Sequence, residues 1–366
     1  MVDIRISRLA RLLTEYSIGV RDGDEVLIRA GVEALPLVRE VYRQVLQFGG
    51  YPHLILQDDI LEEIFYRYAD KKRLEYLSPI EKFMIEKIDA SITIISRSHV
   101  KPLIGISPEK LRLRKAATRE IMEIFMRRHA AKELRWVVSV YPTNALAQEA
   151  GMSPIEYEDF VYDACMVDSD NPTEKWRAQA EEQEKIVELL AKLDELRIIS
   201  EDTDLTLKIG GRKWINDDGH YNMPAGEVFS APVEDSAEGE IRFTYPAIWS
   251  GIEVEDVKLV FKRGEIVEAY AVKGEDKLRE IIRTDDGARK IGEIAFGLNY
   301  SIKKYTRQIL FDEKIGGSIH IALGAAYPDT GGENKSAIHW DFILDMKNGK
   351  VYGDGSLIYE YGSFKL

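Results

Sequence analysis

The feature that most constrains the fold is an alternation, in the first half of the chain, between short runs of branched apolar residues and longer amphipathic stretches. The amphipathic stretches predict helices over 37–47 and 107–129. Ser107 is placed to cap the second of these, with Pro108 at its first helical position. Alternation of this kind predicts an α/β domain with a mostly parallel sheet. The predicted strands are 25–29 (EVLIR), 53–56 (HLIL), 91–95 (SITII) and 136–140 (WVVSV).

The pattern changes near residue 200. A capped start at residues 171–174 (NPTE) and an apolar stripe behind it predict a helix reaching about Leu196. Beyond Ile199 the chain reads as short strands and turns, with helices favoured mainly between 275 and 299, and residues 262–265 (KRGE) predict a hairpin turn. We therefore predict an N-terminal α/β domain over 1–200 and a C-terminal, β-rich α+β domain over 201–366.

Composition excludes several classes of function. The 366-residue chain has a formal net charge of -13, which disfavours nucleic-acid binding because phosphate contacts need an excess of clustered Lys and Arg. Its single cysteine, Cys165, excludes an internal disulfide and a multi-cysteine zinc site, and it is expected to be a core residue rather than a nucleophile. No apolar leader or run of about 18 apolar residues is visible, so we expect a cytoplasmic protein with no membrane span.

Familiar cofactor and nucleophile motifs are also missing. The sequence contains no G-x-G-x-x-G, no G-x-x-x-x-G-K-[ST] and no G-x-S-x-G. A dinucleotide fingerprint, a P-loop and a serine nucleophile elbow therefore have no support.

A series of carboxylates and imidazoles in the second half is the strongest chemical signal. His339 and Asp341 are one residue apart in a strand-like run, so both point to one face of the strand while Trp340 points to the other. His320 lies in another such run, between the small face-mates Ser318 and Ala322. Oxygen and nitrogen donors of this kind suit Zn, Co or Mn. The full series is Glu227, Glu293, Glu313, His320, His339 and Asp341.

Each residue alone also has an ordinary structural explanation. A lone histidine on an alternating strand is usually hydrogen-bonded or at the surface, and a glutamate after a glycine, such as Glu227, is usually solvated. Glu293 is less ordinary, because it lies in a small, apolar stretch and a buried carboxylate needs a cation or a hydrogen-bond partner. Residue types and spacing alone leave both a metal site and coincidence open.

Four blocks in the second half resemble the thermophilic aminopeptidase family, metallopeptidases of the aminopeptidase T and aminopeptidase S type. Further matching segments, such as 141–160 and the region of Trp176, extend the resemblance over nearly the whole chain. The family's architecture implies an N-terminal α/β domain and a C-terminal β-rich metal-binding domain, in a homodimer. The blocks are 210–239 (containing GEVFSAP), 292–299 (GEIAFGLN), 310–332 (containing HIALG) and 334–346 (containing HWD).

The resemblance also implies roles for individual residues. It places a first metal-binding carboxylate at Glu227, a bridging carboxylate at Glu293 and an active-site tyrosine at Tyr327. Glu313 matches a further acidic position, although its spacing to the next ligand varies in the family. His320, His339 and Asp341 complete the implied ligand set for two divalent metal ions.

The expected function is a metal-dependent aminopeptidase that hydrolyses N-terminal residues from peptides with a free N-terminus, using a metal-activated water. Tyr327 is expected to stabilise the oxyanion, and Glu293 or Glu313 to carry the proton to the leaving amine. Two alternatives stay open: a non-peptidase dinuclear metallohydrolase on the same scaffold, and a binding protein without catalysis. Metal analysis and a peptide panel would separate them.

Overall fold

The computed structural model describes residues 3–365, which form two compact units. The first unit comprises the chain up to Thr173 together with Gly219–Pro224, and the second comprises Glu174–Asp218 together with the chain from Ala225 onward. The sequence pattern placed a domain boundary near residue 200, but here most of helix α10 (Pro172–Leu190) belongs to the second unit.

The first unit is built on a five-stranded, fully parallel sheet with the order β2-β1-β3-β4-β8. The predicted α/β class with a parallel sheet is thus confirmed. The last strand is two residues long and comes from far along the chain, so it could not be foreseen from the alternation in the first half. The strands are β1 (Glu25–Gly31), β2 (Tyr51–Gln57), β3 (Ala90–Ile95), β4 (Arg135–Val140) and β8 (Asn222–Met223).

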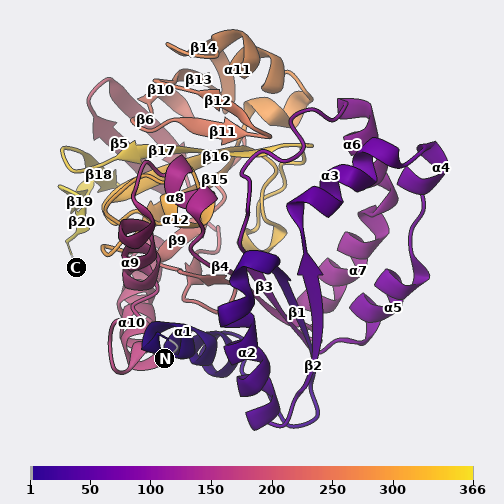
Figure 1. The fold of residues 1–366 in the computed structure, drawn as a ribbon. Helices are drawn as coiled ribbons and strands as arrows, with labels where there is room; N and C mark the ends of the chain where they lie inside the picture. Colours follow the sequence, from indigo (N-terminus) through magenta and orange to yellow (C-terminus); the bar gives the residue numbers. More distant parts are fainter. Residues whose placement is uncertain (1–2, 366) are drawn as a thin grey trace. The chain divides into compact units, whose positions relative to one another are not determined.

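Helices lie on both faces of this sheet: α2 on one side and α5 and α7 on the other (Figure 1). Leu27 of β1 packs with Ile85, Ile88 and Ile124 in the apolar layer between the sheet and the latter pair. Cys165 is fully buried, as expected for a core residue. The helical segments are α1 (Ile4–Arg11), η1 (Leu12–Ser17), η2 (Val32–Ala34), α2 (Leu35–Gln47), α3 (Asp59–Tyr68), α4 (Lys71–Leu74), α5 (Pro79–Lys87), α6 (Pro108–Ala117), α7 (Arg119–Ala130), α8 (Asn144–Glu149) and α9 (Pro154–Ala164).

Three predicted helical stretches differ from those observed. Within the stretch 275–299, only Glu275–Ile281 and Asp286–Arg289 are helical, and Ile291–Gly297 is a strand. The helix expected over 107–129 is interrupted at Thr118, whose hydroxyl donates to the carbonyl of Arg114 and thereby ends α6. The helix expected to reach Leu196 ends at Leu190 instead. Leu196 and Ile198 then alternate into the core as part of a strand, so a period of two replaces the helical period there.

The second unit is β-rich, as predicted, and contains two large antiparallel sheets and a small hairpin. The eight-stranded sheet has the order β14-β13-β10-β6-β5-β18-β19-β20. Its β13–β14 connection is the predicted hairpin turn, with Arg263 and Gly264 both at positive φ. Its strands are β5 (Glu195–Ser200), β6 (Thr203–Lys208), β10 (Glu238–Arg242), β13 (Lys258–Lys262), β14 (Glu265–Tyr270), β18 (Lys350–Gly353), β19 (Ser356–Glu360) and β20 (Ser363–Phe364).

The other large sheet has the order β17-β16-β15-β9-β7 and shares an apolar core with the eight-stranded one. The hairpin β11–β12 is separate from both, and short helical segments fill the connections. No helix within residues 3–365 combines the length and apolarity needed to cross a bilayer. The remaining elements are β7 (Ile215–Asp217), β9 (Glu227–Ser230), β11 (Ala247–Trp249), β12 (Ile252–Val254), β15 (Ile291–Gly297), β16 (Ser318–Gly324), β17 (His339–Asp345), α11 (Glu275–Ile281), η3 (Asp286–Arg289), α12 (Ile309–Asp312) and η4 (Pro328–Thr330).

Candidate metal centre

One face of the five-stranded antiparallel sheet gathers most of the predicted donors. The strand register places Glu293 and Asp341 on either side of Ala322, and pairs Glu227 with Gly297. Neighbours that pair across strands share a face, so residues from four strands converge over small side chains. These residues are Glu227 from β9, Glu293 from β15, His320 from β16, and His339 and Asp341 from β17.

The opposite face of the same strands is apolar. Ile319, Ile321 and Trp340 are buried in the core, whereas Ala322 and Ser318 lie beside His320 on the donor face. The predicted arrangement, with His339 and Asp341 on one side and Trp340 on the other, is confirmed. The small residues leave room for polar side chains on the donor face, while packing of the apolar face against the core holds the strands in place.

Glu293 lies at the centre of the donors. Its Oε1 is 3.2 Å from Nε2 of His320, and its Oε2 is 3.2 Å from Nε2 of His339. The Nε2 atom of His339 is also 3.6 Å from Oδ1 of Asp341. One carboxylate thus faces two imidazoles, the arrangement expected of a group shared between two cations.

Glu227 and Glu313 complete the cluster from the other side. Oε2 of Glu227 is 3.7 Å from Nδ1 of His320. That oxygen is buried and accepts no hydrogen bond within the described residues. The predicted donors form three sets of three residues. Within each set the potential ligand atoms lie within 4.8 Å of one another, and the three sets together include all six predicted donors. The sets are Glu227, Glu293 and His320; Glu293, His339 and Asp341; and Glu313, His320 and Asp341.

A backbone carbonyl orients each of the two imidazoles through its Nδ1 atom. Nδ1 of His320 lies 3.0 Å from the backbone carbonyl of Glu313, and Nδ1 of His339 lies 2.8 Å from that of Ala325. When each imidazole is neutral, with Nδ1 protonated and donating to its carbonyl, Nε2 is left unprotonated and can bind a cation. Metal-binding histidines in proteins are commonly held in this way. The donor types, the second contacts and the uncompensated Glu227 oxygen therefore fit divalent cations.

The electrostatics are those of a site that exchanges protons for cations. Burial raises the pKa of Glu227 well above its usual range, against the opposing effect of Lys314. Burial alone would raise the pKa of Glu293, but hydrogen bonds from His320 and His339 lower it to about 2. Burial also opposes charge on the two imidazoles, yet their contacts with Glu293 raise each pKa to about 10.

Asp341 differs from Glu293 in this respect. Burial raises its pKa to about 6, despite the favourable charges of His339 and His320. Cation binding to such a set must displace protons, because only deprotonated carboxylates and neutral imidazoles act as ligands.

Tyr327 stands at the edge of the cluster. Its ring packs edge-on against His339, with ring centres 5.1 Å apart, and against Phe229. The residue precedes η4 and is 45% exposed. Burial of its hydroxyl and the surrounding carboxylates raise its pKa, so it stays protonated and able to donate a hydrogen bond at neutral pH.

Two charged residues in the cluster were missed from the sequence, Lys314 and Asp217. The Lys314 side chain is fully buried, pairs with Glu313, and reaches Glu227 at 3.3 Å and Asp217 at 3.6 Å. Asp217 is paired with Glu227 in the β7–β9 register. Lys314 directly follows a predicted donor, but nothing in its local sequence indicates that its ammonium group points inward.

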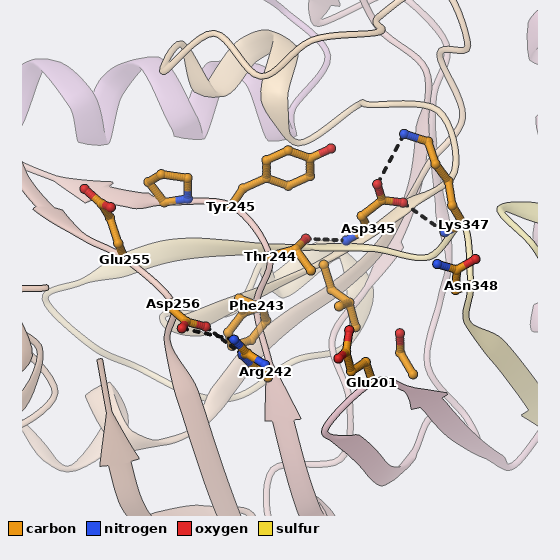
Figure 2. Close-up of a pocket in the computed structure, with 13 residues that line it drawn as sticks. Glu201, Arg242, Phe243, Thr244, Tyr245, Glu255, Asp256, Asp345, Lys347 and Asn348 are labelled. Carbon is orange, nitrogen blue, oxygen red and sulfur yellow. Dashed lines mark hydrogen bonds and ion pairs between the residues drawn. The ribbon is translucent and has the colours of Figure 1, made fainter. Parts of the chain in front are cut away.

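Two cavities lie along β17. The smaller, of about 170 Å³, is lined by His339, Asp341 and Ile343 and by apolar side chains including Ile248 and Trp249. The larger, of about 690 Å³, begins at Pro246, which lines both cavities, and extends past Asp345. Figure 2 shows that larger cavity, where Arg242 pairs with Asp256 and Lys347 with Asp345. Its lining also carries Glu201 and Glu255 but none of the candidate donors, whereas the smaller cavity opens onto His339 and Asp341.

Comparison with known proteins agrees with the predicted resemblance. Aminopeptidase AmpS of Bacillus subtilis (strain 168) is 25% identical, over 95% of this chain and 94% of the relative. Aminopeptidase PepS of Streptococcus thermophilus is 27% identical, over 96% of this chain and 95% of the relative. The solved structure of wild-type AmpT from Thermus thermophilus superposes with a TM-score of 0.86 at 26% identity, covering 99% of both chains.

The family match covers almost the whole sequence. The family described as thermophilic metalloprotease (M29) matches residues 2–364. Membership implies a divalent metal and a hydrolase acting on peptides, as expected from the motif blocks. The chain therefore belongs to the thermophilic metalloprotease (M29) family and is a metallo-aminopeptidase.

Proposed function

We propose that this metallo-aminopeptidase binds two divalent cations, Zn, Co or Mn, and uses them to hydrolyse the first peptide bond of its substrate. The observation that carries the proposal is Glu293, whose two oxygens face His320 and His339 at equal distances. Charge supports it too, because the four carboxylates of the set balance two divalent cations. The proposed ligands are Glu227, Glu293, Glu313, His320, His339 and Asp341.

Bound cations of this kind supply Lewis-acid polarisation of a carbonyl and a water of lowered pKa. The residues around them do the remaining work. Carbonyl contacts to Nδ1 of His320 and His339 hold each Nε2 towards the centre. The protonated Tyr327 hydroxyl donates a hydrogen bond to the oxygen that becomes negative during attack.

Proton transfer to the leaving amine falls to Glu313 rather than Glu293. Glu293 is held by two imidazoles, and its side chain is only 5% exposed. The side chain of Glu313 is 17% exposed, so it can exchange protons with substrate. The candidate centre would offer the substrate's free amino group a cation or an acidic side chain, which would restrict cleavage to the N-terminal bond.

The smaller cavity suggests where the first side chain lies. It adjoins His339 and Asp341, and its walls include Ile248, Trp249 and Ile309. Tyr305, Arg307 and Asp312 also line it, so the apolar part of its wall is what would stabilise an apolar side chain by removing it from water. We therefore expect higher kcat/KM for amides of leucine or phenylalanine than for those of glycine or aspartate.

Two further expectations concern the protein in the cell. The family resemblance supports a homodimer, and the use of a single cysteine supports a reducing cytoplasm. Sedimentation of the purified protein and fractionation of the producing cell would test them.

The function is tested by release of chromophore from amino-acid amides before and after chelation. We expect activity to vanish in EDTA and to return on adding Zn²⁺, Co²⁺ or Mn²⁺. Glu293→Gln should abolish turnover with the fold intact, whereas Glu268→Gln, at an exposed position on β14, should leave it unchanged. Full activity in EDTA would refute the metal mechanism.

A further inference from the structure

Lys314 carries a charged ammonium group in the buried interior of the protein, where lysine side chains are rare. It follows α12 and Glu313, and its side chain is completely removed from solvent. Taking an ammonium group out of water costs several kcal/mol unless negative partners surround it. Lys314 has three such partners: the carboxylates of Glu313, Glu227 and Asp217.

These partners come from different parts of the fold. Glu227 begins β9 and lies next to Asp217 of β7 in the sheet register, whereas Glu313 is in the connection between α12 and β16. No ladder of the described sheet pairs Glu313 with Glu227. The ammonium group of Lys314 bridges them, with Nζ 3.3 Å from Oε1 of Glu227 and in contact with Oε1 of Glu313.

The backbone of Lys314 is fixed as well. Its carbonyl accepts from the N–H of Asn299, and its own N–H donates to the carbonyl of Phe311. The side-chain amide of Asn299 in turn donates to the carbonyl of Ala225, two residues before Glu227. The lysine is therefore anchored to the same short stretch of chain that carries its carboxylate partner.

We propose that Lys314 is a positioning residue of the metal centre: its ammonium group holds the carboxylates of Glu227 and Glu313 in place for cation binding, and Asp217 balances its charge. The proposal rests on the proposed function, because Glu227 and Glu313 are proposed ligands. Each of them contacts Lys314 through Oε1. For Glu227 this leaves Oε2, the oxygen without a hydrogen bond, facing His320 and the centre.

The alternative is that Lys314 only compensates a buried Asp217. The two explanations separate when both members of the pair are made neutral. Asp217→Asn with Lys314→Met removes the ammonium group together with one of its three carboxylate partners, so it leaves one fewer unmatched buried charge than Lys314→Met alone and is the variant more able to fold. Asp217→Asn alone is the matched control, because Lys314 still holds both glutamates there.

The test measures Co²⁺ binding by the full chain after its metal has been removed. Calorimetry gives the affinity, and the visible spectrum of the bound ion reports the geometry of its ligands. We expect the double variant to bind Co²⁺ about 10–100-fold more weakly than wild type, the range typical for loss of a group that supports a metal ligand. Its Co²⁺ spectrum should also shift, whereas Asp217→Asn should show a smaller loss and a wild-type spectrum. Metal-free circular dichroism and melting establish that each variant folds.

Wild-type affinity and spectrum in the folded double variant would overturn the proposal and leave Lys314 with a structural role alone. Lys314→Met by itself should be less stable than the double variant, since it leaves Asp217 buried opposite a neutral side chain. Failure of this proposal and failure of the proposed function give different results. If the wild-type protein bound no Co²⁺, the metal mechanism would fail. If the wild-type protein and the double variant bound Co²⁺ equally well, only the role of Lys314 would be contradicted.

Discussion

At the scale of single residues, Glu293 shows how burial turns a side chain into a functional signal. A carboxylate 4% exposed needs partners, and its place in an apolar stretch already indicated this from the sequence. The partners are His320 and His339, which lie on two other strands. The glutamate is therefore fixed between two nitrogen donors before any cation arrives.

Replacing Tyr327 by phenylalanine removes the proposed oxyanion donor and little else. The ring contacts with His339 and Phe229 remain, so the fold and metal content should not change. We expect kcat to fall about 10²–10³-fold, the usual cost of losing such a donor, with a small change in KM. Steady-state kinetics on a leucine amide measures this, with Tyr361→Phe, an exposed position, as the control. An unchanged kcat would remove Tyr327 from the mechanism.

The imidazoles predict a pH dependence of metal binding. The pKa values of His320 and His339 are raised to about 10 in the metal-free fold, from an ordinary value near 6.5. Each then stabilises the metal-free fold fully below about pH 6.5 and loses that contribution as the pH rises through about 10. Cation binding at pH 7.5 must displace these protons, so affinity should increase with pH.

Calorimetric titration with Co²⁺ in buffers of different ionisation enthalpy measures the protons released. We expect release of about two protons at pH 7.5 as the site fills, because both imidazoles, with pKa values of about 10, must become neutral to bind. Binding without proton release would show that the histidines are not ligands.

The sequence could identify the donors but not the charges that support them. Residue types suggested six candidate donors, the family resemblance implied their roles, and the structure brings all six side chains together. Lys314 and Asp217 are charged residues like many at the surface, and only the pairing of β7 with β9 and the connection after α12 brings them inside. For these two residues tertiary packing decides the burial, and their local sequence carries no record of it.

At the scale of elements, strand alternation and turn residues predicted the structure correctly where the pattern lies within a single element. The β16 run and the H-x-D of β17 have one apolar and one small or polar face, as their sequences indicated. Helix ends were less predictable. Thr118 interrupts a helical pattern by bonding its own backbone, and Leu196 belongs to a strand because β6 and β18 lie on either side of it.

The floor of the site depends on Ala322. It lies in register with Glu293 on one side and Asp341 on the other. Ala322→Leu places a larger side chain among these carboxylates, so we expect at least a tenfold loss of Co²⁺ affinity, and overpacking should cost about 1–3 kcal/mol of folding stability. Metal content after dialysis and chemical denaturation measure the two effects.

Ile321→Leu is the matched control for that variant, because Ile321 points to the apolar core on the opposite face of β16. It should alter stability slightly and leave metal affinity unchanged. Equal metal loss in both variants would show that the strand as a whole, rather than its donor face, was disturbed.

At the scale of the whole molecule, the candidate centre belongs entirely to the second unit. The predicted classes of both halves are confirmed, but the path of the chain is less simple than a single boundary. Residues 219–224 return to the first unit and add β8 beside β4. A strand of two residues is too short to show a hydrophobic period. The sequence pattern therefore could not reveal that these residues return to the first unit.

This separation predicts where metal should stabilise the protein. A ligand at 100 times its Kd stabilises the fold that binds it by about 2.7 kcal/mol. Hydrogen exchange with and without Co²⁺ should therefore show stronger protection in β9, β15, β16 and β17, with little change in β1, β3 and β4 of the parallel sheet. The metal-loaded protein should also melt several degrees higher than the chelated one, as expected for stabilisation of this size in a domain of about 150–250 residues. Glu293→Gln provides the control, since it keeps the sheet while removing the shared ligand. Equal protection of both sheets, or an identical change in the Glu293 variant, would contradict a cation site on the donor face of the second unit.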